Sequence, residues 1–105
     1  MTSIQLKDLI INALEDKKAE DIVALNVAER TILADFFIIC SGKSTTQVKA
    51  LAENVEEKLE AEGIFATRKE GLREGRWAVL DYGSVIVHVF NSDTRDFYAL
   101  EKLWK

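Results

Sequence analysis

The stretch that decides the fold is FFIICSGKSTTQVKA, residues Phe36–Ala50. A short apolar run is followed by a glycine turn and then by apolar residues at helical spacing. This order predicts a buried strand over Phe36–Ser41, a turn at Gly42 and a helix after it. Ser44-Thr45-Thr46-Gln47 has the S-x-x-Q spacing of a capping box, in which the serine side chain accepts a hydrogen bond from the first helical turn. The helix is therefore expected to begin at Thr45.

The Gly42-Lys43-Ser44 turn also resembles part of a phosphate-binding loop. A complete loop, G-x-x-x-x-G-K-[ST], opens with a glycine that lets several backbone N–H groups converge on the phosphates. Phe37 occupies that position here, inside the apolar run. Because a strand residue cannot wrap a pyrophosphate, a nucleotide site is not the expected reading. A residual nucleotide-binding or nucleotidyltransferase enzyme that uses this turn remains the alternative function.

The composition is that of one ordinary globular domain spanning residues 1–105, with 48% apolar and 30% charged residues. The longest uninterrupted apolar run, Phe36–Cys40, is far shorter than the ~18 residues of a membrane helix, and Met1-Thr2-Ser3 has no basic signal region. A cytoplasmic protein without a membrane partner is therefore expected. The lone Cys40 agrees with a reducing compartment.

The net charge is −4, with 18 acidic and 14 basic residues. Unspecific attraction to a nucleic-acid backbone is therefore not expected, because that attraction comes from an excess of Lys and Arg. Any contact with nucleic acid would more readily be mediated by a partner protein. Acidic surface patches favour a basic protein partner.

The segments around the opening stretch predict alternating helices and strands. Thr2–Lys17 reads as a helix with a wide apolar arc, suited to deep burial or to a subunit contact. The second helix, Thr45–Glu62, has an apolar stripe and ends before Gly63, which suits a C′ position. Asp21–Val27 and Phe36–Ser41 are expected to be antiparallel neighbours, because only a short connection joins them.

Three further strands and a closing helix complete the predicted order αββαβββα. The strands are Phe65–Arg68, Trp77–Tyr82 and Val85–Phe90, and the helix is Asp93–Trp104. This order predicts a mixed α/β (α+β) fold with a five-stranded mixed sheet packed against helices.

The last two strands allow a sharper prediction, because Gly83-Ser84 suits a two-residue type II′ turn. That turn pairs Leu80 with Val87 and Val79 with His88, which sets the residues on each face. One face is aliphatic and should pack against the helices: Ala78, Leu80, Tyr82, Val85, Val87 and Val89. The other mixes large apolar groups with an acid and an imidazole, as interaction surfaces do: Trp77, Val79, Asp81, Ile86, His88 and Phe90. A bulge at Gly83 would exchange the two faces.

Catalytic and metal-binding residue sets are hard to assemble from this chain. Cys40 and His88 are the single cysteine and histidine, and both lie in apolar strands with no third orienting group. A zinc site needs about three or four Cys or His ligands. No pair of carboxylates follows an apolar strand with the spacing that would hold magnesium. We therefore expect no enzyme activity, no metal and no cofactor.

A basic, glycine-containing segment, residues 68–76, holds Arg68, Lys69, Arg73 and Arg76. A charged loop is the simpler interpretation, since Glu70 and Glu74 are interspersed, and an anion site is the alternative.

Three segments of the chain, taken together and in order, resemble the Iojap family of ribosomal silencing factors. They are DKKAEDIVALNV (16–27), ADFFIICSGKSTTQVKALAENV (34–55) and EGLREGRWAVLDYGSVIVHVFNSDTRDFYALEKLW (70–104). The match covers essentially the whole chain. The resemblance implies a nucleotidyltransferase-like fold that lacks the transferase's metal-binding carboxylates.

The resemblance further implies a translational repressor. Family members bind the large ribosomal subunit through ribosomal protein L-fourteen, block joining of the small subunit when nutrients are scarce, and often form homodimers when free. On this basis, combined with the hairpin register, Trp77 is the expected binding anchor, meaning the side chain that supplies most of the binding energy. Asp81 and Glu70 are expected to meet basic side chains, and His88 to form a hydrogen bond. Tyr82 and Lys43, the latter as a minor rRNA contact, complete the candidate partner-binding residues.

Overall fold

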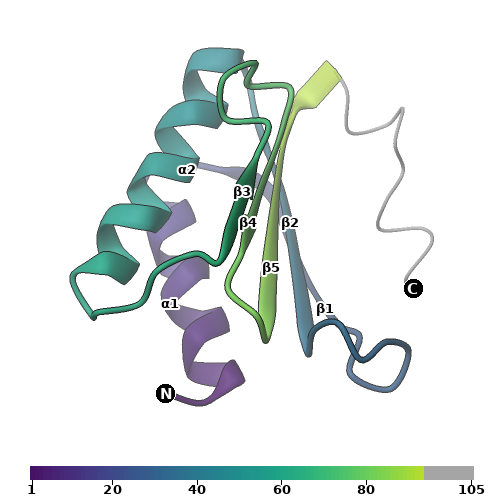
Figure 1. The fold of residues 1–105 in the computed structure, drawn as a ribbon. Helices are drawn as coiled ribbons and strands as arrows, with labels where there is room; N and C mark the ends of the chain where they lie inside the picture. Colours follow the sequence, from purple (N-terminus) through teal and green to yellow (C-terminus); the bar gives the residue numbers. More distant parts are fainter. Residues whose placement is uncertain (94–105) are drawn as a thin grey trace.

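The structure is a computed structural model that describes residues 1–93. In this part of the chain two helices pack on a five-stranded mixed sheet (Figure 1). The elements, in chain order, are α1 (Ser3–Asp16), β1 (Glu20–Asn26), β2 (Phe36–Gly42), α2 (Thr45–Glu60), β3 (Arg68–Glu70), β4 (Trp77–Asp81) and β5 (Val85–Asn91). The predicted fold class and the order of elements through β5 are confirmed. The predicted helix over Asp93–Trp104 lies outside the described residues apart from its first position.

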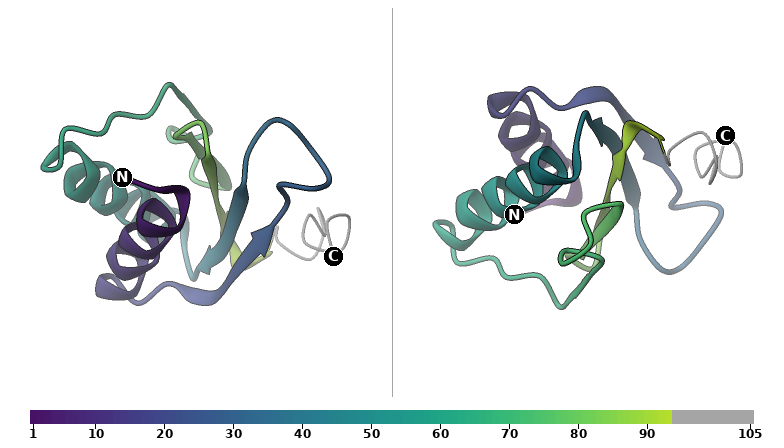
Figure 2. Two further views of the ribbon diagram at one scale, coloured as in Figure 1. Left: turned by 90° about the horizontal axis from the view of Figure 1, so that it is seen from below. Right: turned by 90° about the horizontal axis from the view of Figure 1, so that it is seen from above.

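The strand order in the sheet is β1-β2-β5-β4-β3. β2 and β5 run parallel, while β1 with β2, β5 with β4 and β4 with β3 are antiparallel. Both α1 and α2 lie on the same side of this sheet, as the views from below and above show (Figure 2). The opposite side of the sheet therefore carries no helix from the described residues.

The helix starts follow the sequence signals closely. At α1, Thr2 and Gln5 form a complete capping box, with backbone-to-side-chain distances of 3.1 and 2.8 Å. At α2, Ser44 Oγ accepts from the Gln47 N–H at 3.1 Å, as predicted. The return bond differs, because Gln47 Oε1 accepts from the Lys43 N–H at 2.6 Å and its amide nitrogen reaches carbonyls at the end of α1. Gln47 thus joins the start of α2 to the end of α1.

The main core lies between the two helices and the sheet. Both predicted helical stripes are largely buried there, with the fully buried members being Ile10, Leu14, Val48, Leu51, Ala52, Val55 and Leu59. Leu9 and Ile11 are partly buried at its margin. Asn54 is a buried polar residue that the periodicity did not single out, and its side chain donates to the Ala13 carbonyl at 2.7 Å. This bond satisfies the buried amide and ties α2 to α1.

The hairpin of β4 and β5 has the predicted register. Ala78 pairs with Val89, Leu80 with Val87 and Trp77 with Phe90, so no bulge shifts the strands. Of the two turn residues, Gly83 has a positive φ, 83°, and Ser84 does not. The Tyr82 N–H donates to the Val85 carbonyl at 3.0 Å, which closes the turn. The aliphatic face is buried against the helices, as predicted.

The third strand is shorter and later than predicted: β3 spans Arg68–Glu70, not Phe65–Arg68. Arg68 pairs with Asp81, the last residue of β4, and the Thr67 N–H still donates to the Asp81 carbonyl at 2.7 Å. Earlier residues have no further β4 residue to pair with. Phe65 consequently stays outside the sheet and 64% exposed despite its strand propensity. The end of the neighbouring strand overrides the local preference.

Candidate functional site

The candidate site lies on the side of the sheet away from the helices, here called the Trp77 face. It comprises the side chains of Trp77, Val79 and Asp81 from β4, Ile86, His88 and Phe90 from β5, and Phe37 from β2. The parallel pairing sets Phe37 opposite Ile86 and Ile39 opposite His88, which continues the face onto β2. Trp77 is half-buried, while His88 and Phe90 are 8% and 0% exposed. The centre of this face is therefore more enclosed than its alternating pattern indicates.

Trp77 is held by two aromatic neighbours on β5. Its ring stacks on Phe90, with ring centroids 5.1 Å apart and planes 19° apart. Its indole Nε1–H donates a hydrogen bond to His88 Nδ1 at 3.1 Å. Because Trp77 pairs with Phe90 and lies diagonally from His88, the antiparallel register brings both contacts to one indole.

His88 is a neutral imidazole in this setting. Burial lowers the pKa of His88 from 6.5 to about 4, since the charged form would lose its hydration. With Nδ1 accepting from Trp77, the proton of the neutral ring sits on Nε2. Among residues 1–93, that buried Nε2–H has no hydrogen-bond partner. The ring also meets Phe37 edge-on, with centroids 5.4 Å apart.

The two acidic residues predicted as partner contacts, Asp81 and Glu70, lie on the same face as Trp77. Asp81 lies at the end of β4, where its Oδ1 accepts from the Gly83 N–H at 2.8 Å and closes the turn. Glu70 pairs with Val79 and so points to the same side of the sheet. Arg68 lies on this side too, and its guanidinium meets Glu70 Oε1 at 3.2 Å. Arg68 thus balances part of the predicted negative charge. The sequence-based prediction missed this ion pair because it placed the third strand at Phe65–Arg68 and not at Arg68–Glu70.

Tyr82 is separated from the other candidates by the sheet itself. It is buried in the core under the helices, on the face that the hairpin register assigns to it. Burial, together with the charges of Glu56 and Glu60, raises the pKa of Tyr82 above its ordinary value of 10. Its position does not support the inclusion of Tyr82 among the partner-contacting residues.

Lys43 lies away from the Trp77 face, at the end of β2 and the start of α2. Its side chain is 74% exposed, and its Nζ lies 3.7 Å from Glu20 Oε2. The turn's other polar groups bond within the chain: the Lys43 N–H donates to Gln47 and Ser44 Oγ caps α2. A phosphate at this turn would have to displace these bonds.

Residues 1–93 contain neither a metal-binding cluster nor a membrane-spanning helix. No three His, Cys, Asp or Glu side chains come together in a way that would bind a metal ion. No helix there has both the length and the apolar character needed to cross a membrane.

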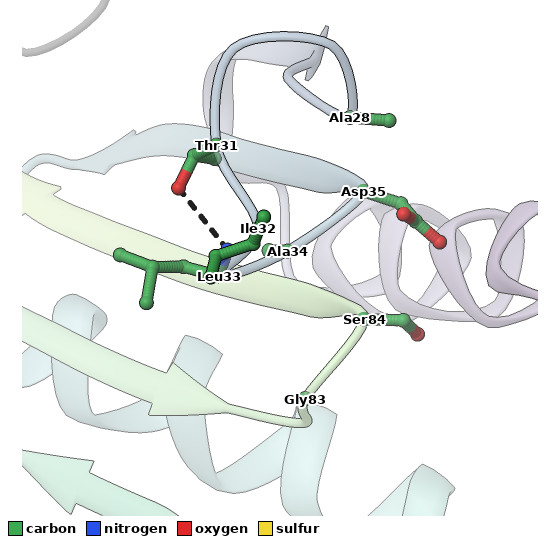
Figure 3. A pocket seen from close by; sticks show the side chains of 8 residues that line it. All are labelled: Ala28, Thr31, Ile32, Leu33, Ala34, Asp35, Gly83 and Ser84. Atoms are coloured by element: carbon green, nitrogen blue, oxygen red, sulfur yellow. Dashed lines mark hydrogen bonds between the residues drawn. The ribbon is translucent and has the colours of Figure 1, made fainter.

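The connection between β1 and β2 forms a pocket of about 480 Å³ against the β4–β5 turn. Figure 3 shows its lining: Ala28, Thr31, Ile32, Leu33, Ala34, Asp35, Gly83 and Ser84. The loop is fixed to the turn, because the N–H groups of Asp35 and Phe36 both donate to the Ser84 carbonyl, at 2.7 and 3.1 Å. Ile32 and Leu33 are nevertheless exposed. Sequence reasoning treated this segment only as a connection.

Phe37 also belongs to the Trp77 face, although the sequence analysis did not identify it as a site residue. In the sequence it stands in an apolar run of β2, 51 positions before His88, and only the parallel β2–β5 pairing brings the two together. The available signal was the unbroken apolar run of β2, which indicates a strand buried on both sides but does not say which strand lies beside it.

Comparison with known proteins gives consistent matches along the chain. The family model described as "Ribosomal silencing factor during starvation" matches residues 1–105. The ribosomal silencing factor RsfS of Halalkalibacterium halodurans is 46% identical, over 99% of this chain and 89% of that protein. A mouse protein named mitochondrial assembly of ribosomal large subunit protein 1 is 30% identical over 92% of this chain, which corresponds to 44% of its own length.

A solved structure agrees with the fold. The crystal structure of a Chromobacterium violaceum protein superposes with a TM-score of 0.97 at 40% identity, covering 99% of this chain and 87% of that one. With the match of the family model over the whole chain, the assignment is plain: the chain belongs to the family described as "Ribosomal silencing factor during starvation".

Proposed function

We propose that this protein is a translational repressor that binds the large ribosomal subunit and sterically blocks joining of the small subunit. Membership of the silencing-factor family supports a ribosome-associated silencing role, and the name of the mouse relative supports the large subunit as the binding partner. The condition in the family description, starvation, suggests that repression operates when nutrients are limiting or in stationary phase. Blocking of this kind needs an interface but no catalysed reaction.

The observation that carries this proposal is the half-buried Trp77, fixed by Phe90 and His88 on the side of the sheet away from α1 and α2. Tryptophan is enriched among the few residues that dominate binding energy, particularly where neighbouring side chains exclude water from it. A rigid ring also loses little conformational entropy on binding. Trp77 therefore has the properties of an interface anchor.

We propose ribosomal protein L-fourteen as the contact on the large subunit. Asp81 and Glu70 lie on the same side of the sheet as the anchor and can attract basic side chains of a ribosomal protein. Steric blocking would require an interface of roughly 1,200–2,000 Å². Lys43, exposed at another edge of the molecule, would make at most a minor rRNA contact.

We further propose that the free protein is a cytoplasmic homodimer that associates through α1. Most of the apolar arc of α1 is used in the core, which leaves Ile4, 57% exposed, and the partly buried Ile11 as the apolar positions for such a contact. Sedimentation at micromolar concentration tests this part of the proposal. A strict monomer would exclude the dimer without affecting the ribosome-binding role.

Co-sedimentation with separated ribosomal subunits tests the main proposal. The protein should pellet with large subunits and not with small subunits, and prior binding should reduce the yield of joined ribosomes when small subunits are added. Failure to pellet with large subunits would exclude the proposal. Pelleting without any effect on joining would retain the partner and exclude the blocking mechanism.

The nucleotide-binding alternative has a separate test. If the Gly42-Lys43-Ser44 turn bound a nucleotide, millimolar Mg-nucleotide would raise the melting temperature, since a ligand that binds only the folded state stabilises it. We expect no such rise, because Ser44 Oγ and the Lys43 N–H already bond to Gln47. A clear rise that disappears in Lys43→Ala would favour the alternative.

A further inference from the structure

We propose that His88 is a positioning residue for the partner-binding surface: it fixes the orientation of the Trp77 indole by accepting its N–H hydrogen bond. This inference rests on the proposed function, in which Trp77 is the anchor. It departs from the sequence-based expectation, in which His88 itself bonds to the partner.

Ring stacking by itself leaves the orientation of Trp77 incompletely determined. Phe90 lies nearly parallel to the indole, and a stacked contact of this kind is also available to an indole turned over about its Cβ–Cγ bond. Only one of these two orientations points Nε1 toward β5. The 3.1 Å bond from Nε1 to His88 Nδ1 selects that orientation.

The surroundings of His88 keep Nδ1 available as an acceptor. An imidazolium has two N–H donors and no acceptor, so protonation would abolish the bond to Trp77. Burial disfavours the charged ring, and the Phe37 and Phe90 rings adjoin the imidazole at centroid distances of 5.4 and 6.5 Å. No charged side chain is paired with His88 among the described residues. The ring is therefore held neutral, with one fixed tautomer.

The imidazole also carries a cost that an apolar ring would avoid. Its Nε2–H is buried and has no partner in residues 1–93, and an unsatisfied buried donor destabilises a folded protein. A phenylalanine at position 88 would fill similar space without that donor. What histidine provides and phenylalanine does not is the acceptor for Trp77.

This arrangement also constrains the chemistry of the partner. Because the indole N–H is already bonded to His88, the partner meets ring carbons at the anchor and gains nothing from offering an acceptor there. We therefore infer that the partner receives the Trp77 ring in a slot lined by aliphatic side chains. Hydrogen-bonding and charged groups of the partner would lie around this slot, opposite Asp81 and Glu70.

Two substitutions at His88 distinguish the effect of the hydrogen-bond acceptor from the effect of the aromatic ring. His88→Phe keeps an aromatic ring and removes the acceptor, whereas His88→Asn loses the ring but places an amide oxygen near the position of Nδ1. If His88 acts through the bond, His88→Phe should weaken binding to purified large subunits about tenfold and His88→Asn should restore most of it. His88→Leu provides a second chain without an acceptor if His88→Phe does not fold.

The indole N–H resonance supplies a readout that packing alone would not change. Trp77→Phe identifies its peak in a ¹H–¹⁵N spectrum. That peak should move toward the position of a non-bonded indole in His88→Phe and return in His88→Asn. Folded acceptor-free chains that bind as tightly as the wild type would overturn this inference alone. A wild-type chain that ignores large subunits would overturn the proposed function, and this inference with it.

Discussion

Gly71 lies so close to Trp77 that a Cβ atom at position 71 would overlap the Trp77 carbonyl oxygen. Gly71 has a φ of +74°, and its own carbonyl accepts from the Gly75 N–H at 3.0 Å, which closes the loop between β3 and β4. The loop therefore returns directly onto the backbone of Trp77. The backbone of the charged segment 68–76 is therefore fixed at Gly71 and Gly75.

Replacing Gly71 by alanine should lower the free energy of unfolding by about 2–4 kcal/mol. The left-handed backbone costs an L-residue about 1 kcal/mol, and the overlap with a backbone atom adds to it because no side chain can move aside. Gly63→Ala is a matched control, since Gly63 has a φ of +75° but nothing within 4 Å of the added Cβ. Its loss should be about 1 kcal/mol. Equal losses in urea unfolding would show that the close approach has no energetic consequence.

Replacing Asp81 by asparagine should weaken binding to the large subunit about three- to fivefold, and more at low salt. Asparagine keeps an oxygen that can accept from the Gly83 N–H, so the turn should be retained while the charge is lost. Binding at two salt concentrations measures the effect. Asp8→Asn on α1, which removes an exposed acid from the helix side, should leave affinity unchanged. A similar loss in both variants would point to net charge and not to this surface.

The parts of the fold that depend on neighbouring residues could be predicted from the sequence. Thr2 and Ser44 act within one helical turn, and Gly83-Ser84 sets the register of two strands that it directly joins. The faces of β4 and β5 followed from that register, including the placement of Trp77 beside His88.

The parts that depend on distant segments could not be predicted. Nothing local indicates that β2 pairs with β5, so the contact between Phe37 and His88 had no sequence signal. The start of β3 depends on where β4 ends, and the misplaced strand hid the ion pair of Arg68 with Glu70. The bond from Trp77 to His88 was likewise missed, because strand register gives proximity but not the orientation of a ring.

The stability of the protein should fall between pH 6.5 and pH 4 partly because of His88. The unfolded chain binds a proton at His88 near pH 6.5, whereas the folded chain does so only near pH 4, so acid favours the unfolded state across this interval. The difference in pKa corresponds to about 3 kcal/mol, fully present above pH 6.5 and lost as the pH reaches 4. Urea unfolding of wild type and His88→Phe at several pH values measures it. Because both chains contain the same carboxylates, parallel stability curves would exclude a buried neutral His88.

Replacing Trp77 by alanine should cost about 2–4 kcal/mol of binding to the large subunit, a loss of roughly 30- to 1,000-fold in affinity, while leaving the chain folded. The fold should survive because Trp77 is half-buried and lies outside the main core between the helices and the sheet.

Tyr82→Phe is the matched control for this last prediction. It changes an aromatic residue just after the other end of β4, but on the helix side, where its hydroxyl is buried without a partner in residues 1–93. Removing that hydroxyl should leave stability equal or higher and affinity within twofold of wild type. A folded Trp77→Ala chain that still pellets with large subunits would exclude Trp77 as the anchor. An unfolded one would instead place Trp77 among the residues that hold the fold together, and binding would then have to come from other side chains of the same face.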